Sequence, residues 1–433
     1  MLRMIDLRGR DHTPAELLAA VPRATSARAE ALLTAAGLVA DVAAHGEAAL
    51  REQAEKFDGA SGHEIRVPAA HLDEALAVLD PKVRAALEEA IVRVRAGSAA
   101  QVPAPSVTQL APGAFVHQRW QPVRRVGLYV PGGKAVYPSS VVMNVVPAQV
   151  AGVQQIALAS PPQRAHGGRV HPVILAAARL LGVDEVYAMG GAGAVGAFAY
   201  GVPTLALEPV DVVTGPGNNF VAAAKRAVAG VVGTDSEAGA TEILIVADDT
   251  ADPRLVAADL ISQAEHDEQA SAVLVTDSES LAAAVLDEIG PLAARTRHAE
   301  RVAAALGGPQ SAVVLVDDLA AATAFSNAYA PEHLELHLSN PDAASFVHAG
   351  AVFVGPHTPV SLGDYLAGSN HVLPTGGQAR YAAGLSAATF LRPQQVIEYD
   401  RAALAEVREA VVTLAEAEDL PAHGEAVQAR FPA

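Results

Sequence analysis

Hydrophobic and polar positions along the chain fall into two alternating kinds of segment. Short runs rich in Val, Ile and Ala are typical of buried strands, and the longer Ala-rich stretches between them repeat apolar residues with helical spacing. The runs that predict strands are Val126–Val130, Gln155–Ala159, Glu185–Ala188, Leu205–Leu207, Val212–Val213, Ile243–Val246, Ala272–Val275, Val313–Val316 and Val352–Val354. The stretches that predict helices include His171–Leu181, Phe220–Ala229, Arg254–Ala264 and Ser280–Ile289. This alternation predicts βαβ units, and hence parallel sheets covered on both faces.

The series of strands and helices divides into two blocks, with helical regions before and after them. We therefore predict an α/β fold with two Rossmann-like parallel-sheet domains and small, mainly helical N- and C-terminal parts. The helices expected outside the blocks include Ala27–His45, Val83–Arg95 and Arg401–Glu418. The expected domains are an N-terminal segment 1–23, an α/β domain formed by 24–128 with 240–387, an α/β domain 129–239 and a small helical domain 388–433.

The net charge of the chain limits the kinds of molecule that it can bind. The 433 residues include 48 Asp and Glu against 30 Lys and Arg, a formal net charge of −18. Such a surface repels nucleic acid and anionic membranes, because phosphate binding needs clustered positive charge. No stretch approaches the roughly 20 apolar residues of a membrane span, and the first ten residues lack the apolar region of a secretory signal. The sequence therefore predicts a cytoplasmic protein with neither nucleic-acid nor membrane partners.

The chain contains no cysteine. Disulfides, thiolate zinc sites and a cysteine nucleophile are therefore excluded. If the protein oxidises an aldehyde, the reaction cannot pass through a thiohemiacetal. Any metal ion must be held by His, Asp, Glu, Gln or Asn side chains.

Three glycine-rich turns are expected in the first α/β block, at Gly127–Gly133, Gly190–Gly196 and Gly215–Asn219. The second contains a G-x-G-x-x-G pattern at Gly191, Gly193 and Gly196, between a predicted strand and a predicted helix. This context suits a phosphate group at the helix N-terminus. Glycines in an Ala-rich chain equally permit tight packing between helices, and no clear carboxylate follows at the usual spacing.

Polar residues capable of chemistry occur in several short segments. Gln263 and His266 are three residues apart and therefore lie on one helical face, and Glu332 and His333 are adjacent proton-transfer groups. Further candidates in the long, Gly-rich connection Val360–Gly384 and in the C-terminal tail are Asp364, His371, Glu418 and His423. Taken singly, each is equally an ordinary polar helix end or solvated loop residue.

Taken together and in this order, the segments resemble the histidinol dehydrogenase family. The resemblance extends from about Arg124 to His423. The blocks that carry it are Gly127–Gly133, Gly215–Asn218, Glu242–Asp248, Ser262–His266, Ala330–His333 and Gly363–Thr375. It implies a homodimeric, NAD-linked oxidoreductase of histidine biosynthesis, which converts L-histidinol through L-histidinal to L-histidine in two steps. Each step would use one NAD.

The resemblance also implies roles for individual residues. One Zn2+ per subunit would be held by Gln263, His266 and Asp364 of one subunit and His423 of its partner, a nitrogen and oxygen set in which manganese or cobalt could substitute. His333 would be the general base, and Glu332 would activate water on the aldehyde. Cofactor contacts are implied for Tyr129, Gly193 and Asn218. Substrate contacts are implied for Thr241, Gln263, His266, His333, Asp364, His371, Glu418 and His423.

Two positions depart from the family's pattern. The family often has Gln where this chain has Gly193, so that side-chain contact with the cofactor is lost here. The Gly-Pro that usually precedes the Ser/Thr-Glu pair is Gly239-Ala240, while Thr241 keeps the hydroxyl group.

Two other functions remain open. One is a related dehydrogenase acting on another small polyol or a sulfonated alcohol. Glu418 and His371 favour histidinol instead, because a sulfonate would require a cation near Glu418. The other is a non-catalytic protein that binds NAD or a metal ion, against which the adjacent Glu332 and His333 argue.

Overall fold

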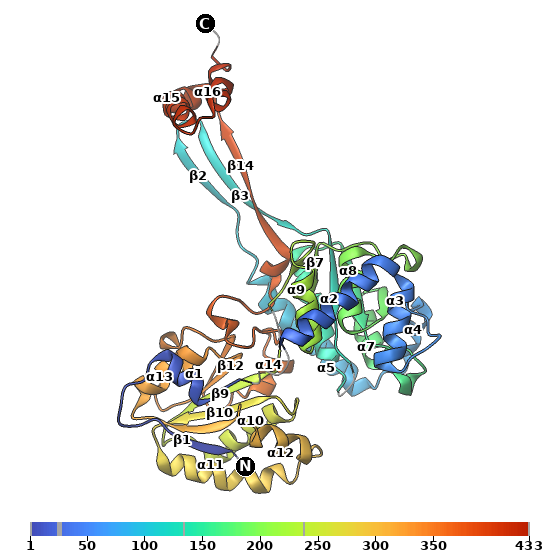
Figure 1. The fold of residues 1–433 in the computed structure, drawn as a ribbon, viewed down its shortest axis with the longest axis vertical. Coiled ribbons are helices and arrows are strands. Elements are labelled where there is room, and N and C mark those ends of the chain that lie inside the picture. Colours follow the sequence, from blue (N-terminus) through green and yellow to red (C-terminus); the bar gives the residue numbers. More distant parts are fainter. Residues whose placement is uncertain (1, 24–27, 133–134, 237–238, 432–433) are drawn as a thin grey trace.

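A computed structural model describes residues 2–23, 28–132, 135–236 and 239–431. Figure 1 shows two bodies, each built on a β-sheet, and a long arm that carries the C-terminus far from both of them. No helix among the described residues is both long and apolar enough to cross a membrane.

The first body contains a six-stranded, entirely parallel sheet. The strand order is β1-β11-β10-β9-β12-β13. The strands are β1 (Arg3–Asp6), β9 (Glu242–Ala247), β10 (Ser271–Thr276), β11 (Ala312–Leu315), β12 (His333–His337) and β13 (Ala351–Val354). Its central strands are fully buried, because helices cover both faces.

The helices of the first body pack on opposite faces of this sheet. On one face, apolar side chains of alternate strand residues contact α10 (Pro253–Ala264), α11 (Glu279–Ala293) and α12 (Ala299–Gly307). On the other face they contact α1 (Pro14–Ala20) and α13 (Leu319–Tyr329). Side chains at the N-caps fix where several of these helices begin: Asp252, Ser278 and Asp318 each accept a hydrogen bond from a first-turn amide.

The second body contains a five-stranded parallel sheet in the order β6-β5-β4-β7-β8. The strands are β4 (Arg125–Tyr129), β5 (Gln155–Ser160), β6 (Glu185–Ala188), β7 (Val212–Thr214) and β8 (Gly233–Thr234). One face is covered by α4 (Ala69–Ala77), α5 (Pro81–Ala99), α6 (Pro138–Ala151) and α7 (Pro172–Leu180). The other is covered by α2 (Arg28–His45), α3 (Glu47–Gln53), α8 (Gly191–Tyr200) and α9 (Asn219–Ala227).

The helices α2 to α5 precede the first α/β block in the sequence, and they belong to this second, five-stranded body. Its helices α2, α4 and α5 contact α8, α9, α7 and α6, and strand β4 is the middle strand of the five-stranded sheet. The sequence analysis instead grouped 24–128 with 240–387, so the contacts place most of this region with the other body. The division into independent domains stays a prediction.

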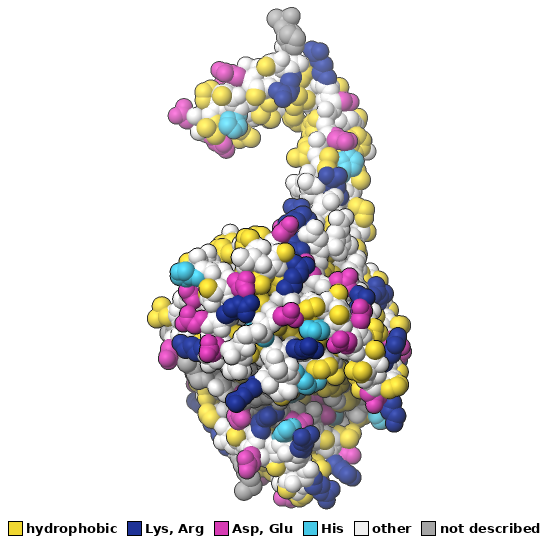
Figure 2. Space-filling view, turned by 90° about the vertical axis from the view of Figure 1, so that its right-hand side faces the viewer, with side chains coloured by type: hydrophobic (Ala, Val, Ile, Leu, Met, Phe, Trp, Pro, Cys, Tyr) yellow, Lys and Arg dark blue, Asp and Glu magenta, His cyan; other side chains and the backbone are white. Residues whose placement is uncertain are grey.

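The arm is a three-stranded antiparallel sheet that ends in two helices. Its strands are β2 (Ser106–Ala111), β3 (Ala114–Pro122) and β14 (Leu391–Tyr399), in the order β14-β3-β2. At the tip, α15 (Arg401–Ala417) packs against α16 (Pro421–Gln428). Figure 2 shows the tip hooked over, with open space between it and the bodies.

The structure confirms the predicted fold class of two parallel α/β sheets with helical terminal parts. Eight of the nine predicted strands are present. The exception is Leu205–Leu207, where Pro203–Leu205 forms a 3-10 turn. Within the long connection, Val360–Tyr365 forms the short helix α14. The pattern did not predict the arm strands β2, β3 and β14, the buried strand β12, or the edge strands β1 and β8.

Candidate active site

A cleft of about 560 Å3 lies between the two bodies. The five-stranded body contributes residues that follow strands β4 and β7, at the carboxyl edge where ligands bind in such sheets. The six-stranded body contributes the residues at which β9 and β12 begin, together with the end of α10 and of α14. The predicted site residues that line this cleft are Tyr129, Asn218, Thr241, His266, Glu332, His333, Asp364 and His371.

His333 is held in one orientation at the start of β12. It is buried, and its Nδ1 lies 3.1 Å from the carbonyl oxygen of Glu242. A carbonyl oxygen only accepts, so Nδ1 carries the proton and Nε2 keeps a free lone pair. Burial also lowers the pKa of the His333 imidazole. The geometry therefore presents a neutral imidazole that can take up a proton.

Glu332 lies beside this imidazole at the end of a short hydrogen-bonded chain. Its Oε2 accepts hydrogen bonds from the Thr241 hydroxyl at 2.6 Å and from the Glu242 amide at 2.9 Å. Burial raises the pKa of Glu332 to about 8, and the Thr241 hydrogen bond opposes that rise. A buried carboxyl group with a pKa near neutrality can act as a general base or acid.

Gln263 and His266 at the end of α10 provide potential metal ligands. The amide nitrogen of Gln263 donates to the Thr241 hydroxyl at 2.7 Å, which directs its Oε1 elsewhere. Among the described residues, neither Gln263 Oε1 nor His266 Nδ1 has a hydrogen-bond partner, although both atoms are buried. Two such atoms fit a bound cation, because buried polar atoms otherwise find partners. Asp364 lines the same cleft as His266 and offers a carboxylate.

His371 lies between the two bodies and contacts one residue of each. Its Nε2 lies 2.9 Å from the hydroxyl of Ser140 at the start of α6, and its Nδ1 lies 2.9 Å from the backbone carbonyl of Asp364. Burial lowers the pKa of His371. Ser140 lines the cleft and is a site residue that the sequence analysis did not identify.

The glycine-rich turn after β7 forms the floor on the opposite side. Gly215 has a φ of +121°, and a Cβ there would lie 1.9 Å from the carbonyl oxygen of Tyr129. The next glycine, Gly217, lies against Val221, and Asn218 caps α9 by accepting from the amides of Phe220 and Val221. The start of a helix, with its partial positive charge, suits an anionic group.

A buried ion pair holds this turn in place on the side that faces away from the cleft. Lys225 on α9 donates to the carbonyl oxygen of Gly215 and to Asp235, both at 2.5 Å. Asp235 in turn accepts from the Gly215 amide at 2.8 Å. Both side chains are buried, so the pair fixes the turn rather than facing the cleft. Lys225 and Asp235 were also missed by the sequence analysis, since no motif links them.

Gly193 lies outside the residues that line the cleft. It is buried in α8, and a Cβ there would approach the side-chain oxygen of Gln53 on α3 at 2.4 Å. Gly196 similarly packs against Val39 of α2. These two glycines therefore permit close packing of helices, and the contact of Gly193 with a cofactor stays a prediction. Tyr129 does reach this helix, because its hydroxyl accepts from the amide of Gly191 at 3.1 Å.

Glu418 and His423 are far from the cleft of their own chain. Glu418 ends α15 and His423 lies in α16, so both are at the tip of the arm, and both are exposed. The structure of one chain thus assembles all the predicted catalytic and metal-binding residues except His423. Of the predicted substrate contacts, Gln263, Glu418 and His423 are not among the residues that line the cleft, although Gln263 bonds to Thr241, which does line it.

Comparisons with known proteins identify the family of the chain. The model of the family described as histidinol dehydrogenase matches residues 21–431. A histidinol dehydrogenase of Leifsonia xyli subsp. xyli is 66% identical over 432 residues, covering 99% of each chain. One of Thermobifida fusca is 58% identical over 434 residues, covering 100% of this chain and 98% of the relative. The crystal structure of histidinol dehydrogenase from Elizabethkingia anophelis superposes with a TM-score of 0.92 at 31% identity, covering 99% of this chain and 98% of that one.

Proposed function

Because the chain belongs to the histidinol dehydrogenase family, we propose that it oxidises L-histidinol through L-histidinal to L-histidine, with two NAD molecules used in turn and one Zn2+ per subunit. The reaction would be the last step of histidine biosynthesis, carried out in the cytoplasm. The observation that carries the proposal is the neutral His333, fixed by the Glu242 carbonyl beside Glu332 and two unpartnered ligand atoms.

The metal ligands in this proposal are Gln263, His266 and Asp364, completed by His423 of the partner subunit. The unpartnered Gln263 Oε1 and His266 Nδ1 support this set. It contains two nitrogens and two oxygens, which suits a chain without cysteine. When bound, zinc orients the substrate's alcohol and amine groups and stabilises negative charge on oxygen.

His333 acts as the base in the first oxidation. Its free Nε2 takes the proton of the substrate hydroxyl while the carbon-bound hydride leaves for the nicotinamide. One alcohol thus yields one aldehyde, one reduced cofactor and one proton on His333. The hydrogen bond from Nδ1 to the Glu242 carbonyl keeps the required tautomer throughout.

Glu332 acts at the second stage, where water must add to the aldehyde. The carboxylate takes a proton from water as the oxygen attacks the carbonyl carbon. The protonated His333 gives its proton to the former carbonyl oxygen, which completes the hydrate and restores the neutral base. The hydrate then loses hydride to a second NAD and a hydroxyl proton to His333, and histidine results. Hydrogen bonds from Thr241 and the Glu242 amide orient Glu332 for this task.

The cofactor and substrate would occupy opposite ends of the cleft. The turn Gly215–Asn218 and the start of α9 would bind the pyrophosphate of NAD, with Tyr129 alongside. Thr241 and His371 would contact the substrate, and Glu418 of the partner subunit would pair with its amino group.

The proposed partner is a second copy of the same chain. Glu418 and His423 lie on an arm that extends away from the cleft of their own chain, which supports a site in which the arm of a second chain supplies them. The arm also exposes apolar side chains that association could cover, namely Val107, Leu110, Ile397, Leu414 and Leu420.

The ratio of NADH formed to L-histidinol consumed tests the reaction. Two equivalents are expected, and one equivalent would indicate a simple alcohol dehydrogenase. No NADH from L-histidinol, with turnover of another polyol, would favour a related dehydrogenase instead.

Mixing two inactive variants tests the shared site. His266→Ala and His423→Ala chains damage opposite contributions to one metal site, so a mixed dimer contains one doubly defective site and one intact site. Activity should return after subunit exchange. If exchange is verified by mass labelling and no activity returns, the sites are not shared.

A further inference from the structure

A column of buried polar side chains runs along β12, away from the cleft. Residues two apart on a strand face the same way, so His333, Glu335 and His337 share the face that lies under α10. Leu334 and Leu336 face the opposite, apolar side. His333 belongs to the cleft, whereas the proposed reaction leaves Glu335 and His337 without a task.

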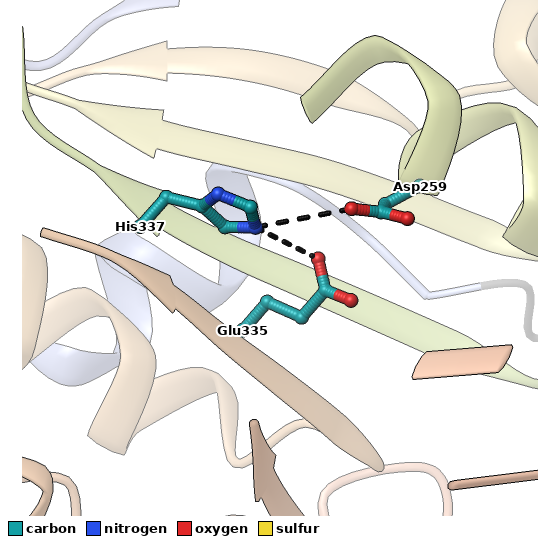
Figure 3. A group of neighbouring side chains, drawn as sticks. All are labelled: Asp259, Glu335 and His337. Carbon is teal, nitrogen blue, oxygen red and sulfur yellow. Dashed lines mark ion pairs between the residues drawn. The ribbon is translucent and has the colours of Figure 1, made fainter. Parts of the chain in front are cut away.

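Asp259 on α10 meets the far end of this column (Figure 3). The Nε2 atom of His337 lies 3.4 Å from Glu335 Oε2 and 3.8 Å from Asp259 Oδ2. The ligand atoms of all three residues lie within 4.8 Å of one another. Glu335 is 1% exposed and His337 5%, while the Asp259 side chain keeps 15% of its surface in contact with solvent.

One oxygen of Glu335 is satisfied and the other is not. Oε1 accepts a hydrogen bond from the amide of Val360, the first residue of α14, at 2.7 Å. Oε2 is buried and, within the part of the chain that the structure describes, has no hydrogen-bond partner. It is directed into the space shared with His337 and Asp259. An unpartnered buried carboxylate oxygen carries a free-energy cost that a cation would remove.

The charges of the cluster also call for a cation. Two carboxyl groups face each other in a buried site, and no Lys or Arg among the described residues pairs with either. Burial and the neighbouring Glu335 carboxylate raise the pKa of Asp259 to about 7. This repulsion is relieved either by a proton held within the cluster or by a metal ion.

We propose that Asp259, Glu335 and His337 form a second metal site, which binds a divalent transition-metal ion and suits Zn2+ best. Tetrahedral Zn2+ with ligands at about 2.0–2.2 Å places neighbouring ligand atoms about 3.3–3.6 Å apart, close to the 3.4 and 3.8 Å observed. The imidazole selects against Mg2+ and Ca2+, which prefer oxygen ligands. Two carboxylates balance the charge of the ion, and the partial exposure of Asp259 gives it a route in and a position for water.

The ion would brace the elements that carry the cleft residues. It would join α10 to β12 directly, and Glu335 Oε1 would extend the link to the start of α14. The same helices carry Gln263 and Asp364, one turn further along α10 and within the short α14. This second site does not rest on the proposed function, because none of its three ligands lines the cleft.

Zinc content per chain tests the proposal. Purified protein, stripped of metal and reloaded with Zn2+ alone, should hold two equivalents by elemental analysis after removal of free ion. His337→Gln and Glu335→Gln should each hold one, and Glu335→Gln keeps an oxygen for the Val360 amide. His266→Ala should also hold one, but at the other position. His45→Gln is the matched control, since His45 forms an exposed pair with the single carboxylate of Asp41 at 2.7 Å, and it should keep two.

Each pattern of zinc content decides between the two sites. One equivalent that is lost in His266→Ala and kept in His337→Gln overturns the second site and leaves a proton held within the cluster as the explanation. One equivalent that is kept in His266→Ala and lost in His337→Gln supports the second site and counts against the metal site of the proposed function.

A measurement on the unaltered protein covers the case in which the variants do not fold. Crystals of the zinc-loaded protein, recorded at the zinc absorption edge, should show an anomalous peak between Asp259, Glu335 and His337. A peak only at Gln263 and His266 would overturn the proposal.

Discussion

The two parallel sheets share a design but bury different kinds of side chain. In the five-stranded sheet, the strand faces are filled mainly with Val, Leu, Ala and Tyr, and the largely buried Arg125–Glu185 ion pair lies where β4 and β6 begin, at the edge opposite the cleft. The described residues that this body contributes to the cleft include the glycine-rich turn after β7 and no Asp, Glu, His, Lys or Arg side chain. In the six-stranded sheet, one face of β12 carries three buried titratable side chains, and Glu242 begins the neighbouring β9.

In the proposed function, this difference assigns cofactor binding to the five-stranded body and proton transfer to the six-stranded body. A turn held by glycine and by a buried ion pair presents fixed amides, which an anionic cofactor needs in any protonation state. Buried imidazole and carboxyl groups have shifted pKa values, which proton transfer needs. The division predicts that changes on the six-stranded side alter rates, whereas changes on the five-stranded side alter cofactor affinity.

Replacing His333 on the six-stranded side should have the largest effect. His333→Asn removes the proposed base of both oxidations, so the rates with L-histidinol and with L-histidinal should both fall by about 10²–10⁴-fold, with little change in the KM for NAD. Single-turnover measurements give these rates directly. His348→Asn is a suitable control, because His348 Nδ1 also lies 3.0 Å from a backbone carbonyl but outside the cleft. Normal rates in His333→Asn would remove the imidazole from the mechanism.

Replacing Glu332 should affect one stage more than the other. Glu332→Gln keeps the shape and loses the charge, so L-histidinal oxidation should slow by about 10²-fold or more while the first hydride transfer changes little. Measuring both stages in the same preparation provides the internal control. A variant that slows only the alcohol step would assign Glu332 to orientation of His333 or to substrate binding.

A change in the five-stranded body should alter the affinity for NAD and leave the rate of the reaction nearly unchanged. In Gly217→Ala, the added Cβ would lie 2.5 Å from the Cβ of Val221, and relief of such overpacking costs about 1–3 kcal/mol. The KM for NAD should therefore rise by roughly 5–150-fold, with the single-turnover rate at saturating NAD nearly unchanged. Gly37→Ala is the control, since nothing lies near a Cβ at that helical position. A slower rate at saturation without a change in KM would break the separation.

The acid limb of the pH profile should show the smallest effect. The base must be neutral, and burial lowers the pKa of His333 from the ordinary value of 6.5. Protonation of His333 therefore removes activity only below that pH. For the alcohol step, measured with L-histidinol and without a role for Glu332, kcat/KM should stay level from about pH 7.5 down to about pH 6.5 and fall about tenfold per pH unit below the pKa of His333. A limb centred above pH 6.5 would show that burial does not govern this group.

Strands that bury apolar side chains could be predicted from the sequence, whereas strands that carry polar or exposed side chains could not. Apolar strands such as Ile243–Val246 and Glu185–Ala188 were predicted, because a strand buried on both faces reads as a continuous apolar run. Strand β12, His-Leu-Glu-Leu-His, was missed because its polar residues alternate as they do on a solvent-exposed face, although here that face is buried. Strands β2 and β14 were missed because they are largely exposed, and β3 because it is half-buried along its whole length, so none of the three has a strong pattern.

Only those residues of the candidate site that lie in recognisable sequence motifs could be predicted. The cleft residues were identified from a family resemblance, and the structure brings most of them together. Contacts such as Ser140 with His371, 231 residues apart, have no local signal. The cluster of Asp259, Glu335 and His337 had two weak signals. Glu335 and His337 have strand spacing, and Asp259 precedes Gln263 by one helical turn, but nothing in the sequence joins the two pairs.

The arm has a consequence for synthesis on the ribosome. Strand β3 is the middle strand, yet its partner β14 is made much later: Arg119 bonds to Gln394, 275 residues further along the chain. At about 5–20 residues per second, the β2–β3 hairpin has an unpaired edge for roughly 15–50 seconds, and such edges recruit other strands. Nascent chains on neighbouring ribosomes should therefore associate through this edge. Chains truncated at residue 390 should show fast hydrogen exchange along β3, and protection equal to that of the complete chain would refute this order of assembly.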